Sequence, residues 1–163
     1  MKQTNIGNLL KASAKAVCLM LAPALFTACT GDVVMHQYED TDVWNWQQDD
    51  TVKFDLPEIT HSCRLEAEIG VRTTSSYPFA SLYLLGTMEK DNVPISTDTI
   101  TVSIYNKRGN ENGKGFPYYT TVKPIPAIHV DSGATYTYKI THFMAEPAIK
   151  GVKSIGLKLE LAE

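Results

Sequence analysis

Residues 63–71 have the sequence Cys-Arg-Leu-Glu-Ala-Glu-Ile-Gly-Val, in which apolar and polar positions alternate with a period of two. The odd positions are apolar, whereas Arg64, Glu66 and Glu68 occupy even positions. Successive side chains of a β-strand point to opposite faces, so this alternation predicts a strand with one buried face. We therefore expect Cys63 to point into a core and the two glutamates to belong to a solvated face.

Other segments carry similar signals. Residues 99–105 and 152–161 also alternate, and residues 80–88 form a nearly continuous apolar run, which is typical of a central strand covered on both faces. A short helical turn is expected only at residues 144–150, where Pro147 limits its length. Seven or eight short strands without alternating helices predict an all-β fold, an antiparallel β-sandwich of jelly-roll type, with a barrel as the weaker alternative. The remaining strand-like runs are residues 116–122, 127–130 and 134–143.

Residues 106–115 contain three glycines and no apolar residue, so we expect a hairpin loop that joins two strands. Lys107, Arg108 and Lys114 lie in this loop on an otherwise acidic chain. Because loops vary while sheets hold them in place, we interpret these three cations as a docking site. The alternative is that the loop is only solvent-exposed padding.

Residues 1–28 have the features of a bacterial lipoprotein signal peptide. Three lysines and no acid precede the uncharged residues 16–28. A helix that crosses about 30 Å of hydrocarbon needs roughly 20 apolar residues, so this stretch is too short to remain in a membrane. The sequence Leu25-Phe26-Thr27-Ala28-Cys29 resembles the lipobox, which predicts cleavage before Cys29 and attachment of lipid to its sulfur. An ordinary secretory peptide is the alternative.

Cleavage before Cys29 would leave a chain long enough for one domain. We expect residues 29–50 to carry the lipidated cysteine and a polar tether, and residues 51–163 to form the sandwich. Without the three lysines of residues 1–28, the chain has 12 basic and 18 acidic residues, and a net charge of −6 argues against nucleic acid as a partner. Cys18 would be lost and Cys29 acylated, which leaves Cys63 without a disulfide partner.

No pattern in the sequence indicates catalysis. His36, His61, His129 and His142 share no metal-ligand spacing, and a nucleophile elbow is absent. The glycine-rich loop lacks the Gly-Lys-Ser/Thr ending of a phosphate cradle. We therefore expect a protein that is not an enzyme and that uses no cofactor or metal.

Trp44 and Trp46 suggest a rival function. Their equal parity would place both rings on one face of a strand, where they could stack on a sugar. Alternatively, they close the open end of the sandwich, because tryptophan at the entry to a small core usually packs there.

Several runs follow one another in a recognisable order. In chain order, these runs are Ile69-Gly70-Val71-Arg72, Tyr77-Pro78-Phe79, Leu82-Tyr83-Leu84, Thr97-Asp98-Thr99-Ile100, Tyr136-Thr137-Tyr138-Lys139-Ile140, His142-Phe143-Met144, Ile149-Lys150-Gly151-Val152 and Ser154-Ile155-Gly156-Leu157-Lys158-Leu159-Glu160. This order resembles the GldH family of gliding-motility lipoproteins. Two features depart from the family pattern, because Ala145 replaces an arginine and the glycine loop lacks a tryptophan.

The resemblance implies a non-enzymatic, lipid-anchored accessory protein of gliding motility and its associated secretion machinery, with Cys29 as the lipid-bearing residue. Its partners would be the membrane and other cell-envelope lipoproteins or motility and secretion proteins. Thr30-Gly31-Asp32-Val33 contains one acid rather than the dense acidic tag that accompanies surface export. This favours the outer membrane, facing the periplasm. The rival hypothesis is a surface glycan-binding lipoprotein that uses Trp44 and Trp46.

Overall fold

The computed structural model describes residues 32–162, which form ten β-strands. In that part of the chain, no helix is long and apolar enough to cross a membrane. The strands are β1 (Val33–Asp40), β2 (Trp46–Gln47), β3 (Val52–Asp55), β4 (Cys63–Thr73), β5 (Ser81–Lys90), β6 (Val93–Ser103), β7 (Tyr119–Val130), β8 (Tyr136–His142), β9 (Ala148–Ile149) and β10 (Val152–Leu161).

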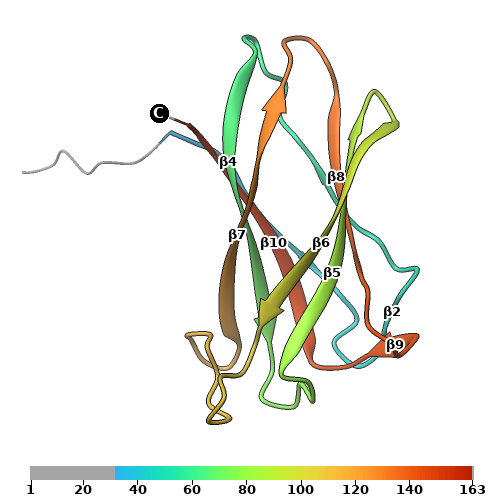
Figure 1. Cartoon of the computed structure of the whole chain (residues 1–163), viewed down its shortest axis with the longest axis vertical. Helices are drawn as coiled ribbons and strands as arrows, with labels where there is room; N and C mark the ends of the chain where they lie inside the picture. The colour runs from blue at the N-terminus through green and yellow to red at the C-terminus, as the bar shows by residue number, and fades with distance from the viewer. Residues whose placement is uncertain (1–31, 163) are drawn as a thin grey trace, which may run out of the picture. The chain divides into compact units, whose positions relative to one another are not determined.

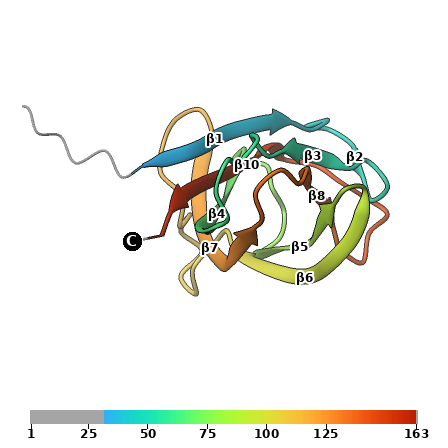
Figure 2. The same ribbon diagram turned by 90° about the horizontal axis from the view of Figure 1, so that it is seen from above.

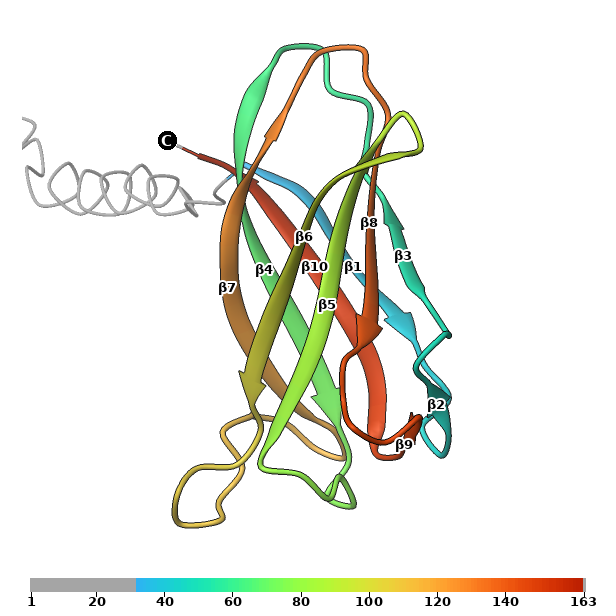
Figure 3. The same ribbon diagram turned by 45° about the vertical axis from the view of Figure 1, so that its right-hand side comes forward.

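Eight strands form two antiparallel four-stranded sheets that pack as a sandwich (Figures 1 and 2). One sheet has the order β1-β10-β4-β7 and the other has the order β3-β8-β5-β6. The short strands β2 and β9 pair separately, toward the end of the domain that also carries the loop between β6 and β7 (Figure 3). Apart from the β5–β6 connection, the links between the long strands cross from one sheet to the other. This is the arrangement of a jelly roll, so the predicted fold class is confirmed.

The alternation of apolar residues correctly predicts the central strands. In β4, the odd positions from Leu65 to Thr73 are buried, and β10 has the predicted bounds. Cys63 is only half-buried because it lies at the start of β4, although it packs against the core. The largest fully buried side chains are Trp46, Phe54, Leu65, Ile69, Leu82, Leu84, Ile104, Ile140, His142, Ile155, Leu157 and Leu159.

Strand β7 joins two runs that the sequence analysis separated. It is continuous from Tyr119 to Val130, although it contains Pro124 and Pro126. Proline lacks the N–H donor that a central strand needs, and it is tolerated here because β7 is an edge strand with one paired side. The two prolines therefore interrupt the sequence pattern without interrupting the strand.

Two local predictions are wrong. Residues 106–115 do not close a hairpin, because β6 and β7 belong to different sheets. The hairpin is instead β5–β6, whose turn residues Asp91 and Asn92 have positive φ angles of 50° and 64°. Residues 144–150 contain no helical turn, because the chain there extends into β9, which pairs with β2.

The structure also differs from the predicted boundary at residue 51. Strand β1 lies in the segment expected to be a tether, and it pairs with β10 from Val33 to Asp40. This pairing completes the hydrogen bonding of β10, which is a central strand with neighbours on both sides. As an edge strand, β1 buries only Met35, so its sequence shows little alternation.

Candidate functional site

The loop between β6 and β7 is held in one shape by its own hydrogen bonds. Asn106 Oδ1 accepts hydrogen bonds from the backbone N–H groups of Arg108 (2.8 Å) and Asn110 (3.1 Å). At its other end, Lys114 and Thr120 exchange two backbone hydrogen bonds of 3.1 and 2.9 Å. The loop is therefore an ordered part of the domain.

This loop displays the three cations that the sequence analysis identified. Lys107, Arg108 and Lys114 are exposed. Phe116 follows directly after residues 106–115 and is 92% exposed, although its side chain was not among the predicted site residues. Aromatic residues and arginine are both enriched in protein interfaces. We call residues 106–116 the basic loop.

The two tryptophans do not share a ligand-facing surface. Trp46 is 1% exposed, its Nε1–H donates to the carbonyl of Asp50 (2.9 Å), and its ring contacts that of His142 edge to face at 5.2 Å between centroids. Trp44 is 76% exposed. A stacking pair therefore cannot form, and Trp46 instead packs at the end of the core.

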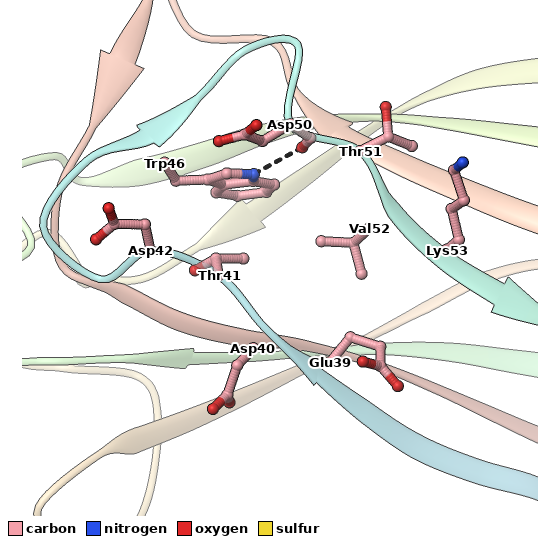
Figure 4. Close-up of a pocket in the computed structure, with 9 residues that line it drawn as sticks. All are labelled: Glu39, Asp40, Thr41, Asp42, Trp46, Asp50, Thr51, Val52 and Lys53. Atoms are coloured by element: carbon pink, nitrogen blue, oxygen red, sulfur yellow. Dashed lines mark hydrogen bonds between the residues drawn. The ribbon is translucent and has the colours of Figure 1, made fainter.

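A cleft of about 520 Å³ lies beside Trp46, where acidic side chains from the end of β1 and from the segment before β3 gather (Figure 4). Some of these acids have local partners: Asp42 accepts the backbone N–H of Trp44 (2.9 Å), and Asp40 pairs with Lys153 (2.5 Å). No group of three or more His, Cys, Asp or Glu residues within residues 32–162 is placed to hold a metal ion. The cleft acids are Glu39, Asp40, Asp42 and Asp50.

The outer face of the β1-β10-β4-β7 sheet carries a row of four residues in register, Tyr38, Gly156, Gly70 and Val122. The Tyr38 ring lies over both glycines. A Cβ atom at Gly156 would lie 2.5 Å from Tyr38 Cε1, and one at Gly70 would collide with the Tyr38 hydroxyl. The two glycines thus make room for the ring. A groove of about 460 Å³ adjoins it, lined by His36, Tyr38, Glu68, Gly70, Thr120, Val122, Gly156 and Lys158.

Arg72 lies on the same face and stacks on Tyr38. Its Cζ atom is 3.7 Å from the centroid of the ring, which is the geometry of a cation–π contact. In the sequence, Arg72 and Gly70 are recognisable only as parts of a run, and Tyr38 falls within the segment predicted to be a tether. The available signal was glycine at an outward-facing position of a strand, which often marks a close approach of another group.

His142 is the only fully buried histidine among residues 32–162. Its Nε2 atom lies 3.2 Å from the carbonyl of Trp46, and its Nδ1 atom accepts the backbone N–H of Met144 (3.4 Å). Burial lowers the pKa of His142, although the Trp46 carbonyl opposes this shift. The ring is therefore neutral in the folded domain near pH 7, and it connects β8 to β2.

We expect the folded domain to lose stability in acid partly through His142. An unfolded histidine has a pKa of about 6.5 and takes up a proton more readily than buried His142. The contribution of His142 is therefore complete above about pH 6.5 and is lost as the pH falls through the lower folded-state pKa. Urea unfolding at pH 7.5 and 5.0 should show a smaller pH difference for His142→Gln than for the wild type. The exposed-site control His129→Gln should match the wild type, and equal pH differences in all three proteins would contradict the prediction.

Cys29 lies outside the described residues, so its lipidation stays a prediction.

Comparisons with known proteins identify relatives of this chain. The gliding motility lipoprotein GldH of Flavobacterium johnsoniae is 25% identical in an alignment of 152 residues that covers 87% of this chain and 93% of that protein. Among solved structures, dimeric latent PorU from Porphyromonas gingivalis aligns with a TM-score of 0.36 and 9% identity, over 80% of this chain and 13% of that one. Eiger TNF from S. frugiperda aligns with a TM-score of 0.38 and 8% identity, over 82% of this chain and 89% of that one. The family model described as GldH lipoprotein matches residues 33–159, and the chain therefore belongs to the GldH lipoprotein family.

Proposed function

We propose that this chain is a membrane-anchored accessory protein of gliding motility and its associated secretion machinery, and that it acts by docking to other cell-envelope proteins. The family match and the name of the Flavobacterium johnsoniae relative support the motility role. Lipid on Cys29 supplies the anchor, which holds the domain at the outer membrane, facing the periplasm. No catalytic step is part of this proposal.

The basic loop is the observation that carries the docking mechanism. It combines three exposed cations with Phe116, whose ring is 92% exposed. Because hydrogen bonds already fix the loop, a partner does not have to order it on binding, and this lowers the entropic cost of association.

The position of the basic loop suits a tethered protein. Register pairing places the end of β1 at the same end of the sheet as the start of β7, where the loop joins the sheet. The chain enters the domain at the other end of β1, and eight strand residues at about 3.3 Å each separate the two ends by roughly 25 Å. The loop thus lies away from the point at which the chain leads toward Cys29.

Removing the three positive charges of the basic loop should weaken docking without affecting the fold. The test variant carries Lys107→Ser, Arg108→Ser and Lys114→Ser. A photo-crosslinking amino acid at exposed Asn110 reports contact in intact cells and does not depend on lysine chemistry. We expect the crosslink to the partner to fall about tenfold in this variant, since several charge-assisted contacts are lost.

The matched control removes two lysines and one arginine from exposed positions outside the loop, through Lys53→Ser, Arg64→Ser and Lys150→Ser. It should crosslink as well as the wild type. Equal crosslinking by the loop variant and this control would contradict docking through the loop. Binding of the purified protein to a glycan array, with no protein crosslink, would instead favour the rival glycan-binding function.

A further inference from the structure

We propose that Arg72 binds a carboxylate of the docking partner, so that the partner's contact surface is acidic and extends from the basic loop onto the outer face of the β1-β10-β4-β7 sheet. This inference rests on the docking function proposed above. It adds the chemistry of the partner and a second point of contact.

Arg72 differs from the neighbouring cations in what holds it. Lys158 pairs with Glu160 (2.8 Å) and Lys153 pairs with Asp40 (2.5 Å). Across residues 32–162, by contrast, no acceptor forms a hydrogen bond or ion pair with the Arg72 guanidinium, which instead stacks on the Tyr38 ring. Its N–H donors remain available in the plane of the guanidinium group. That planar fork matches the two oxygens of a carboxylate.

The stacking also prepares Arg72 for binding. The glycines at positions 70 and 156 let the Tyr38 ring lie flat on the sheet, and the ring then fixes the guanidinium 3.7 Å above its centre. A free arginine side chain loses rotamer entropy when it is immobilised, and a stacked one has already lost part of it. Arginine and tyrosine are also the residue types that most often dominate interface energetics.

Arg72 is continuous with the basic loop. It is paired in register with Thr120 of β7, and Thr120 exchanges two backbone hydrogen bonds with Lys114 of the loop. A partner seated on the loop therefore reaches Arg72 without a gap. Glu68 lines the groove on this face, beside its register partner Lys158. Arg72 and the three cations of the basic loop have no carboxylate partner among the described residues, which favours an acidic partner surface.

The test uses the full-length lipoprotein in intact cells, with a photo-crosslinking amino acid at Val122, which lines the groove and is 51% exposed. The crosslinked partner peptide should contain Asp or Glu. Arg72→Gln should reduce the crosslink about tenfold or more, because a charge-assisted bidentate contact is lost. Arg64→Gln, an exposed arginine on the same strand, should leave it unchanged.

Two further variants keep the result interpretable. Tyr38→Leu retains Arg72 but removes its support, and it should also lower the crosslink. Arg72→Glu should abolish the crosslink, and replacing the partner's acid with arginine should then restore it. A wild-type crosslink from Arg72→Gln, a partner peptide without an acid, or no crosslink at Val122 would overturn the proposal. If the loop variant loses the Asn110 crosslink while Arg72→Gln keeps the wild-type crosslink at Val122, docking through the loop stands and the Arg72 inference fails.

Discussion

Replacing Gly151 with alanine should lower the free energy of unfolding by about 3 kcal/mol, through two separate penalties. Gly151 has a φ of +88°, a conformation that disfavours any residue with a Cβ atom. That Cβ would also lie 2.7 Å from Tyr77 Cα and 2.8 Å from its backbone nitrogen, and backbone atoms cannot move aside as a side chain would.

The site cannot relax easily, because Gly151 joins three segments of the chain. Its N–H donates to the carbonyl of Val43 (2.7 Å), and its carbonyl accepts the N–H of Thr74 (2.8 Å). Any shift that relieves the clash with Tyr77 therefore weakens one of these hydrogen bonds. Chemical denaturation should report the loss directly, and the midpoint of thermal unfolding should fall by roughly 10 °C.

Gly133 provides a matched control. Its φ of +75° is similar, but a Cβ atom there would meet no atom within 4 Å. Gly133→Ala should therefore cost only the conformational term of about 1 kcal/mol. If the two variants lost equal stability, the contact with Tyr77 would contribute nothing and the explanation would be wrong.

Replacing Cys29 with serine should move the protein almost entirely from the membrane fraction to the soluble fraction. Buried acyl chains contribute about 0.8 kcal/mol per CH₂ group, and serine cannot carry the thioether-linked lipid. Salt-washed membranes should therefore retain the wild type and lose Cys29→Ser, as measured by fractionation and immunoblotting. The released domain should unfold at the same denaturant concentration as the wild type.

Cys63→Ser serves as the control, because it removes the other cysteine of the cleaved chain while leaving the anchor in place. It should stay with the membranes. Retention of Cys29→Ser in salt-washed membranes would mean that something other than lipid on Cys29 holds the protein there.

The sequence predicts the interior of the fold better than its edges. Residues 63–71 and 152–161 alternate because β4 and β10 each press one face against a dry core. Strand β1 and the first half of β6 are edge segments whose side chains are mostly exposed, so burial imposes little pattern on them. Composition correctly predicts a loop at residues 106–115. It cannot indicate that the loop crosses between sheets, because that depends on the pairing of distant strands.

The dependence on distant strands also explains why the contact between Tyr38 and Arg72 at the surface was not predicted. Lys107, Arg108 and Lys114 are close together in the sequence, so their shared loop could be predicted. Tyr38 and Arg72 belong to β1 and β4, and they meet only because β10 lies between these strands with a glycine at the crossing point. No local pattern contains that information.

The pairing of β1 with β10 also determines when the domain can be completed. The first long strand finds its partner in the last one, so the sheet stays open until the C-terminal residues have left the ribosome. At 5 to 20 residues per second, synthesis from β1 to β10 takes on the order of 10 s. Sandwiches with such distant contacts also fold slowly, in milliseconds to seconds. The nascent chain thus cannot complete this sheet before its last strand has been made.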